Sequence, residues 1–427
     1  MANSMRIESK KINVGIGFVT GRKNFKNVLR AYLNNWNECS TLDRKKYALH
    51  LFVAYDLKYS GTNVSDYNII EEDILGTVDS ALYIGKSLIS SEARNLMKKK
   101  IATAKELKLI FGEGYAMKRN SVLYFALKNK MDSLIFLDDD EYPIANIQVN
   151  ESTVWKGQDV LTTHIQNIAF ADITHGHHCG YISPIPYMKF NDDFSEPDFR
   201  MLIEAVSNDI ITWESVKKKM TDGGVTYADL DIIDSMTVKI VKEVGGMKFI
   251  SGANLGFNLT DPTKLFPFYN PPGARGEDTF LSTCIGECDI RKVPCYTFHD
   301  GFLAYPRLLS GVLPNVLKTI DISTSTNYKR FLKASIGWIR YKPLLLLITN
   351  SENYQAEIQE IKKKLAIVIP KICTYFGNND FCILLKELDF YDMHVYEHFQ
   401  DFQDTKGVWL KVVAFLDGDH TNIPSIK

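Results

Sequence analysis

The chain has 427 residues, which at a typical length of ~150 residues per domain predicts about two to three domains. Hydrophobic residues make up 45% and charged residues 24%, a balance typical of globular proteins and too apolar for a disordered chain. Fifty basic and 51 acidic residues give a net charge of −1, which excludes the strong positive field of a dedicated nucleic-acid binder. We therefore expect no nucleic-acid partner.

Two further features of the composition bear on location. Apolar runs such as residues 344–348 are far shorter than the ~18 residues of a membrane span, and the first eleven residues lack the apolar core of a secretory signal. Seven cysteines are scattered along the chain, which favours reduced thiols over a disulfide framework. The sequence predicts a cytoplasmic protein, and a membrane-peripheral one is the alternative.

The first two thirds of the chain alternate between short apolar runs and helical patterns, which is typical of layered α/β proteins. Residues 25–36 carry apolar side chains at helical spacing, directly after an apolar run rich in β-formers. The elements expected here are strand 12–19, helix 25–36, strand 47–55, helix 92–106, helix 117–128 and strand 133–137.

The pattern changes twice after Pro143. The elements expected in the middle of the chain are extended segments 179–182 and 247–258, helix 278–287 and strand 291–298. From about residue 308, helical patterns dominate through residue 388. We therefore predict a catalytic domain over residues 1–310 and a helical domain over residues 311–427.

The strongest chemical signal is the run Asp138, Asp139, Asp140 and Glu141, which directly follows the strand expected at 133–137. Four carboxylates at the end of a buried strand are costly unless something neutralises them. Ligands of open α/β sheets bind at the carboxyl ends of the strands, and clustered carboxylates suit Mg²⁺ or Mn²⁺. The alternative is an acidic loop after an ordinary edge strand.

Two weaker signals follow later in the chain. Glu277 and Asp278 come after a Pro/Gly-rich loop, and either they include a general base or they only favour the start of a helix. His299 ends the strand expected at 291–298, where it is either a metal ligand or a hydrogen-bonded residue.

The order of these pieces resembles the glycosyltransferases of the GT-A fold, most closely the inverting family 2 type, over residues 11–305. The resemblance rests on five ordered features. They are Thr20 after the first strand with Asp56 after the second, the Gly112–Gly114 turn leading to Arg119-Asn120, the Asp-x-Asp motif at Asp138–Asp140, the "G-x-N" segment at Gly252–Asn254 and the "E-D" pair at Glu277-Asp278.

The resemblance implies a GT-A-like α/β/α sandwich with a mixed central sheet, followed by a mainly helical C-terminal domain. It implies a metal-dependent hexosyltransferase that moves a sugar from a nucleoside-diphosphate sugar, with UDP favoured, to an acceptor hydroxyl. The acceptor would be a glycan, a lipid-linked sugar, a polyol-phosphate polymer or a protein. An inverting outcome is expected, with retention as the alternative, and the helical part either covers the acceptor side or makes an oligomer contact.

The resemblance also implies roles for individual residues. Asp278 would be the general base and Glu277 would hold the acceptor together with Gly252 and Asn254. Mn²⁺ or Mg²⁺ would be bound by Asp140, with Asp138 and His299 as further ligands. The nucleotide sugar would be bound by Thr20, Asp56, Lys118, Arg119, Asp138 and Asp139.

Two other classes of protein stay open. A nucleotidyltransferase acting on a sugar phosphate would also set carboxylates and Mg²⁺ against a nucleotide, and would release pyrophosphate. A non-catalytic sugar-binding or scaffold protein would not need both acid groups. The family's "Q-x-x-R-W" segment of processive synthases does not occur in the sequence, which favours the addition of one or a few sugars.

Other motifs are weaker. The histidines and cysteine within 175–179 lack a matching second ligand pair for zinc, so a strand and loop that line the active cleft are favoured. The lysine runs 98–100, 217–219 and 362–364 are typical of solvated helix faces, with contact to anionic lipid head groups as the alternative. Trp338 and the neighbouring apolar residues are expected in a helical core.

Overall fold

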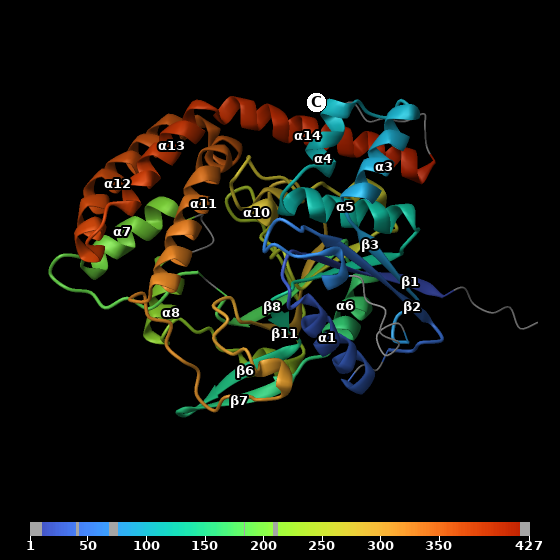
Figure 1. Cartoon of the computed structure of the whole chain (residues 1–427), viewed down its shortest axis with the longest axis horizontal. Helices are drawn as coiled ribbons and strands as arrows, with labels where there is room; N and C mark the ends of the chain where they lie inside the picture. The colour runs from blue at the N-terminus through green and yellow to red at the C-terminus, as the bar shows by residue number, and fades with distance from the viewer. Residues whose placement is uncertain (1–10, 40–41, 68–75, 183, 208–211, 419–427) are drawn as a thin grey trace, which may run out of the picture.

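The computed structural model describes residues 11–39, 42–67, 76–182, 184–207 and 212–418. It is a mixed α/β protein whose C-terminal part is helical, and Figure 1 shows the helices α11 to α14 curving beside and over the sheet. The prediction of an α/β layer followed by helices is confirmed at this level.

A nine-stranded mixed sheet forms the centre of the fold, in the order β3-β2-β1-β4-β10-β8-β11-β5, with β9 paired to β11. Its strands are β1 Ile12–Thr20, β2 Tyr47–Tyr55, β3 Ser80–Ile84, β4 Ser133–Leu137, β5 Glu141–Tyr142, β8 Ile173–Gly180, β9 Lys239–Ile240, β10 Leu255–Asn258 and β11 Ile290–His299. A separate hairpin joins β6 Ile144–Val149 to β7 Ser152–Gly157.

The direction of each strand decides which residues meet at one edge. β1 runs parallel to β2 and β4, and β10 is antiparallel to both β4 and β8. β11 is parallel to β8. The carboxyl ends of β1, β2, β4, β8 and β11 therefore share one edge of the sheet, and β10 begins at that same edge.

Helices cover both faces of the sheet (Figure 1). Those before the C-terminal part are α1 Phe25–Cys39, α3 Lys86–Lys98, α4 Ala104–Phe111, α5 Tyr115–Lys128, α6 Val160–Ile168, α7 Glu196–Val206, α8 Trp213–Thr221, α9 Leu230–Ser235 and α10 Glu277–Ser282. Those of the C-terminal part are α11 Ser325–Thr349, α12 Tyr354–Phe376, α13 Ile383–Met393 and α14 Val395–Asp417.

The C-terminal helices share hydrophobic cores with the rest of the chain. α12 packs on α7, and Phe280 of α10 lies in the same core as residues of α11. α14 packs on α4, where Trp409 is buried and donates a hydrogen bond from Nε1 to the Leu265 carbonyl at 2.9 Å. The boundary near residue 310 stays a prediction, since elements from both sides of it pack together.

Four expected elements differ from the structure. The helix expected at 92–106 is two helices, because Thr103 and Glu106 form a capping box that starts α4. The helix expected at 278–287 ends at Ser282, and only the last four residues of the extended segment 247–258 form a strand. The segment expected at 179–182 belongs to a longer strand, β8, which begins at Ile173.

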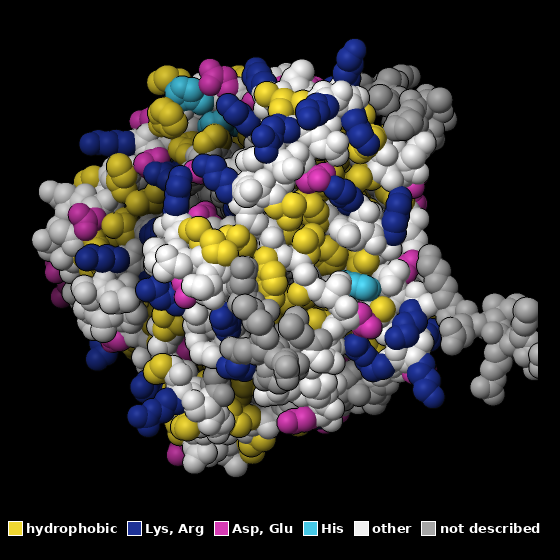
Figure 2. Space-filling view, turned by 45° about the vertical axis from the view of Figure 1, so that its right-hand side comes forward, with side chains coloured by type: hydrophobic (Ala, Val, Ile, Leu, Met, Phe, Trp, Pro, Cys, Tyr) yellow, Lys and Arg dark blue, Asp and Glu magenta, His cyan; other side chains and the backbone are white. Residues whose placement is uncertain are grey.

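The surface mixes charges with exposed apolar side chains. On the face in Figure 2, Lys and Arg side chains are spread between hydrophobic and acidic ones. Among the described residues, no helix is both long enough and apolar enough to cross a membrane.

The packing of α14 can be tested with Trp409→Ala. Trp409 is 1% exposed, so we expect the substitution to lower the free energy of unfolding by about 3–5 kcal/mol, as for other buried aromatic residues. Tyr396→Ala on the same helix, where the side chain is 67% exposed, should change it by less than about 0.5 kcal/mol. Urea unfolding would measure both, and equal effects would contradict the packing.

Candidate active site

The candidate site lies where the carboxyl ends of β1, β2, β4, β8 and β11 meet. Thr20 is the last residue of β1, Asp138 follows β4 and His299 is the last residue of β11. Asn254 precedes β10, which starts at this edge because it runs in the opposite direction. Residues that are more than 250 positions apart in the sequence are thus brought to one end of the sheet.

Carboxylate oxygens of Asp138, Asp139 and Asp140 all lie within 4.8 Å of one another. The Thr20 hydroxyl donates a hydrogen bond to Asp139 Oδ2 at 2.6 Å. Arg22 lies against the same group, with Nη1 2.6 Å from Asp140 Oδ2 and Nε 3.3 Å from Asp139 Oδ1. The predicted acidic cluster therefore exists, and an arginine from the β1 loop neutralises part of its charge.

The pKa values of the three aspartates differ, because each carboxylate is affected by burial but has different charged neighbours. Burial, together with the charge of Asp140, raises the pKa of Asp138 to about 8. Burial raises the pKa of Asp139 to about 6, although Arg22 acts to lower it. Asp140 is as deeply buried, but His299 and Arg22 hold its pKa below the usual value. Asp140 is therefore the carboxylate with the strongest preference for the charged form.

His299 belongs to this cluster. Its Nε2 lies 3.2 Å from Asp140 Oδ2, and its Nδ1 lies 2.8 Å from the carbonyl oxygen of Tyr181, to which an N–H there can donate. Burial alone would lower the pKa of His299, but the charge of Asp140 raises it to about 9. The structure thus places His299 beside the predicted acids, in contact with Asp140, and its predicted role as a metal ligand stays a prediction.

Glu141 turns to a different set of partners. Its Oε2 accepts a hydrogen bond from the Thr297 hydroxyl at 2.6 Å, and its Oε1 lies 3.1 Å from His178 Nδ1. Burial would raise the pKa of Glu141, but His178 lowers it. The fourth acid of the run is therefore part of the sheet interior between β8 and β11.

The second acidic pair is held by backbone and by Arg119. Asp278 Oδ2 accepts a hydrogen bond from the Gly252 amide at 3.2 Å, and Oδ1 accepts one from the Thr279 amide at 2.9 Å. Glu277 Oε1 lies 3.7 Å from Arg119 Nε. Burial and the charge of Glu277 raise the pKa of Asp278 to about 6, while Arg119 acts against them.

Arg119 lies between the two acidic groups. It is 3% exposed, and its guanidinium carbon lies 5.3 Å from the ring centre of Phe136 in β4 and 5.5 Å from that of Phe268. Its charge acts to lower the pKa of Asp138 as well as that of Asp278. A single buried cation therefore faces the acids after β4 and the acids of α10.

Gly252 leaves room for this arginine. A Cβ at Gly252 would lie 3.2 Å from Arg119 Nη2 and 3.6 Å from Asp278 Cβ. Gly252 thus combines a backbone donor for Asp278 with close packing against Arg119, and this is the contact that the "G-x-N" segment makes with the "E-D" pair.

The side chain of Asn254 is buried and hydrogen-bonded to neighbouring strands and to a helix. Its side-chain amide donates to the carbonyls of His177 and Cys295 at 3.1 and 3.3 Å, and its Oδ1 lies 2.8 Å from His164 Nε2. Its φ of +50° is in the left-handed region, which asparagine tolerates better than most residues. These contacts hold the start of β10 against β8 and β11, and its predicted role toward an acceptor stays a prediction.

Asp56 and Lys118 lie on the β2 side of the site. The Asp56 amide donates to the Thr20 carbonyl at 2.9 Å, and its Oδ1 accepts from the Lys58 amide at 2.9 Å. Lys118 of α5 is partly buried, which lowers its pKa, while the charge of Asp56 acts in the opposite direction. The two predicted nucleotide-binding residues therefore lie near each other at the carboxyl end of β2.

The acidic cluster fits a divalent cation. Its donors are all carboxylate oxygens, as Mg²⁺ and Mn²⁺ prefer. The buried Asp139 Oδ1 faces Arg22 Nε at 3.3 Å but accepts no hydrogen bond among the described residues. Among those residues the three aspartates are the one group of potential ligands of this kind, and the histidines of β8 form none. Asp138, Asp139 and Asp140 are thus the residues that would hold the ion.

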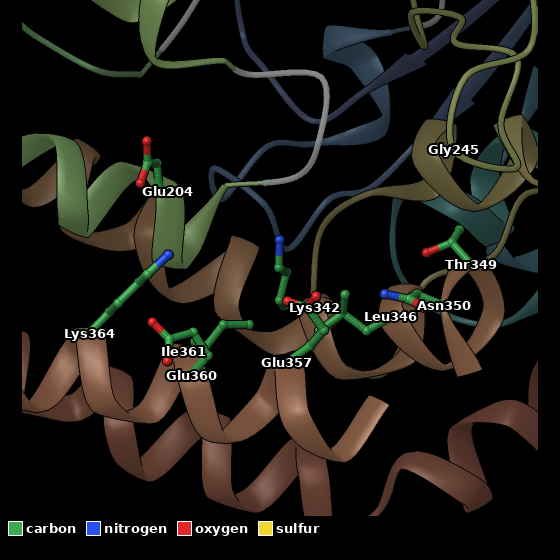
Figure 3. A pocket seen from close by; sticks show the side chains of 10 residues that line it. All are labelled: Glu204, Gly245, Lys342, Leu346, Thr349, Asn350, Glu357, Glu360, Ile361 and Lys364. Carbon is green, nitrogen blue, oxygen red and sulfur yellow. The ribbon is translucent and has the colours of Figure 1, made fainter. Parts of the chain in front are cut away.

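A hollow of about 360 Å³ lies elsewhere, between α7, α11 and α12 (Figure 3). Its lining includes both acidic and basic side chains, namely Glu204, Lys342, Glu357, Glu360 and Lys364. Lys342 Nζ donates to the Ser207 carbonyl at 2.6 Å. None of the predicted site residues lines this hollow.

Arg22 was missed as a site residue in the sequence, although a buried acidic triplet requires a nearby cation. It is two residues past the end of β1. Because β1 pairs with β4 in parallel, this position brings it close to the acids after β4. Since Arg22 contacts two of the carboxylates that would bind a metal, the arginine and the ion would compete for the same negative charge.

This competition predicts that Arg22→Gln binds Mn²⁺ more tightly. Removing the guanidinium leaves buried carboxylates without their ion-pair partner, so we expect the Kd for Mn²⁺ to fall about tenfold. Electron paramagnetic resonance of free Mn²⁺ would measure it. Arg44→Gln, which removes an exposed arginine paired with Asp79, is the control and should leave the Kd unchanged; an equal or higher Kd for Arg22→Gln would contradict the competition.

Comparison of the chain with models of protein families gives no match, and comparison with curated proteins gives none either. The function proposed for the chain therefore rests on the geometry of its own residues.

Proposed function

We propose that the chain is a metal-dependent glycosyltransferase with a GT-A-like catalytic region. It would transfer a sugar from a nucleoside-diphosphate sugar, with UDP as the favoured nucleotide, to an acceptor hydroxyl. The observation that carries the proposal is the position of Arg119 between two acidic groups, Asp138–Asp140 after β4 and Glu277-Asp278 in α10. Such a transfer needs one acidic group for a cation and another for a proton.

The first acidic group would serve the leaving diphosphate. Asp138, Asp139 and Asp140 would hold Mg²⁺ or Mn²⁺, and the ion supplies positive charge to the diphosphate as negative charge develops on it. His299 orients Asp140 through its 3.2 Å contact and keeps that carboxylate charged. Arg22 adds a second positive charge at the same carboxylates.

Asp278 would take the proton of the acceptor hydroxyl. A general base works best when its pKa lies near the working pH, and burial beside Glu277 raises the pKa of Asp278 to about 6. The hydrogen bonds from the Gly252 and Thr279 amides fix the direction of its two oxygens. Direct attack by an acceptor deprotonated in this way inverts the anomeric carbon.

The nucleotide would bind at the carboxyl ends of β1 and β2. Thr20 orients Asp139, and Asp56 and Lys118 offer a carboxylate and an ammonium group on the neighbouring strand and helix. This position agrees with the general rule that open α/β sheets bind ligands at the carboxyl ends of their strands.

The proposal predicts slow hydrolysis of one nucleotide sugar in the absence of an acceptor. In a panel of donors, we expect Mn²⁺-dependent release of the free nucleoside diphosphate, and we expect this release to stop in excess EDTA. The Asp140→Asn variant should release it at least a hundredfold more slowly, which is about the cost of losing a key electrostatic group. Asp234→Asn, at an exposed residue paired with Lys156, is the control. Full activity in EDTA would contradict the metal site. Release of pyrophosphate from a nucleoside triphosphate and a sugar phosphate, without hydrolysis of any nucleotide sugar, would indicate a nucleotidyltransferase.

The proposed base predicts a specific pH profile. Asp278 must be deprotonated to accept a proton, so activity should fall as the pH drops through about 6, and Asp278→Asn should remove transfer while nucleotide binding stays within threefold. Glu277→Gln removes the neighbouring negative charge that raises the pKa of Asp278, so the acidic limb should move to lower pH. The pH at half-maximal kcat/KM measures this, and an unmoved limb would contradict the assignment.

A further inference from the structure

The helix α11 lies against the loop that carries the second acidic pair. Arg330, Gly337 and Tyr341 are seven and four residues apart, so they lie on one face of α11. The Arg275 amide donates to the Gly337 carbonyl at 3.5 Å, and a Cβ at Gly276 would lie 2.9 Å from the Tyr341 ring. This face of the helix is therefore the one that faces the site.

Two more contacts fix the loop on the C-terminal helices. Arg340 Nη1 donates to the Gly273 carbonyl at 2.8 Å, and the same arginine forms a two-point ion pair with Glu387 of α13, with both N–O distances at 2.8 Å. The Tyr391 hydroxyl donates to the carbonyl of Pro272. The position of Glu277 and Asp278 thus depends on α11 and α13.

Arg330 extends from α11 toward the acidic cluster. A Cβ at Gly301 would lie 2.6 Å from Arg330 Nη2 and 2.6 Å from His299 Cε1, so the guanidinium and the imidazole are neighbours. The guanidinium carbon lies 4.9 Å from the ring centre of Phe302. Its buried Nε has no hydrogen-bond partner, and Arg330 has no carboxylate partner within ion-pair distance among the described residues.

Arg275 approaches from the loop before α10. Its aliphatic stem packs on Gly337 of α11, where a Cβ would lie 2.6 Å from its Cδ and Cγ, while the residue as a whole is exposed. In the part of the chain that the structure describes, its guanidinium forms no ion pair. Gly337 and Gly301 thus make space for two arginines that lack acidic partners.

The charges of these arginines act on one another. Burial lowers the pKa of Arg330, Asp140 acts to raise it, and the positive charges of Arg275 and Arg22 lower it further. Arg22 is compensated by Asp139 and Asp140, but Arg275 and Arg330 are not. Arg330 is partly buried, and a partly buried cation without an acidic partner is costly, so an anionic ligand would remove that cost.

We infer that Arg330 and Arg275 form a binding site for a phosphate group of a substrate, next to Asp140 and His299. Guanidinium groups match phosphate oxygens with two parallel N–H donors, and the unpaired Nε of Arg330 provides such a donor. The site joins the C-terminal helices to the catalytic region, because one arginine comes from α11 and the other packs on it.

The source of the phosphate rests on the proposed function. In a glycosyltransferase it is either the diphosphate of the donor or a phosphate carried by the acceptor, since the site lies between the cluster after β4 and the loop that holds Asp278. The chemistry of recognition is the same in both cases, and binding experiments separate them.

The test is isothermal titration calorimetry with inorganic phosphate and with UDP. We expect inorganic phosphate to bind the wild-type chain, and Arg330→Gln and Arg275→Gln each to raise its Kd at least tenfold. Gly301→Ala should have the same effect, because it displaces Arg330 while the charge is kept. Arg200→Gln, at an exposed residue paired with Glu204 on α7, is the control and should change the Kd less than twofold.

The two sources give different results in the double variant of Arg330 and Arg275. A Kd for Mg²⁺-UDP raised at least tenfold assigns the site to the donor diphosphate. If the double variant instead binds UDP with an unchanged Kd, but no longer binds inorganic phosphate in the presence of saturating UDP, the site belongs to the acceptor. Equal phosphate binding by the wild type and the variants, or no binding by the wild type, overturns the inference.

The binding data also separate this inference from the proposed function. Phosphate binding that depends on the two arginines, in a chain that hydrolyses no nucleotide sugar, would retain the anion site and refute the glycosyltransferase. Metal-dependent hydrolysis with phosphate binding unaffected by the variants would retain the enzyme and refute the anion site. Because Arg275 is exposed, its variant should fold even if Arg330→Gln does not.

Discussion

The burial of three carboxylates at the end of β4 is the constraint on which the rest of the site depends. Burial raises the pKa of Asp138 and Asp139, so the charged forms persist only where cations are close. Arg22 and His299 come from the ends of β1 and β11 to meet this need at Asp140. The sheet topology therefore determines the electrostatics of the site, because the parallel pairing of strands puts these residues together.

The C-terminal helices are part of the same arrangement. α11 and α13 hold the loop before Glu277 through Arg340 and Tyr391. α14 packs on α4 and α5, and its Trp409 is buried and hydrogen-bonded. Arg330 reaches from α11 to the neighbourhood of His299. A region whose sequence shows only helical patterns thus places an arginine beside His299 and fixes the position of one acidic pair.

Some expectations followed directly from local chemistry. The strands 12–19, 47–55 and 133–137 were predicted within a residue, because long apolar β-rich runs between polar turns are strong signals. The helix at 92–106 was wrong because a capping box at Thr103 starts a new helix, and a cap can interrupt an otherwise continuous apolar pattern. The helix at 278–287 was too long because its second half precedes β11 in a turn.

The sequence by itself determined the α/β alternation, the helical final part, the acidic triplet at a strand end and the list of candidate acids, since these depend on neighbouring residues. Only the tertiary structure decided that Arg119 lies between the two acidic groups and that the side chain of Asn254 is bound in the interior. It also brought Arg22 to Asp140 and Arg330 to His299 from distant parts of the chain. The physical reason is that buried charges are compensated through space, and the partners of a carboxylate are set by strand direction and helix packing rather than by sequence distance.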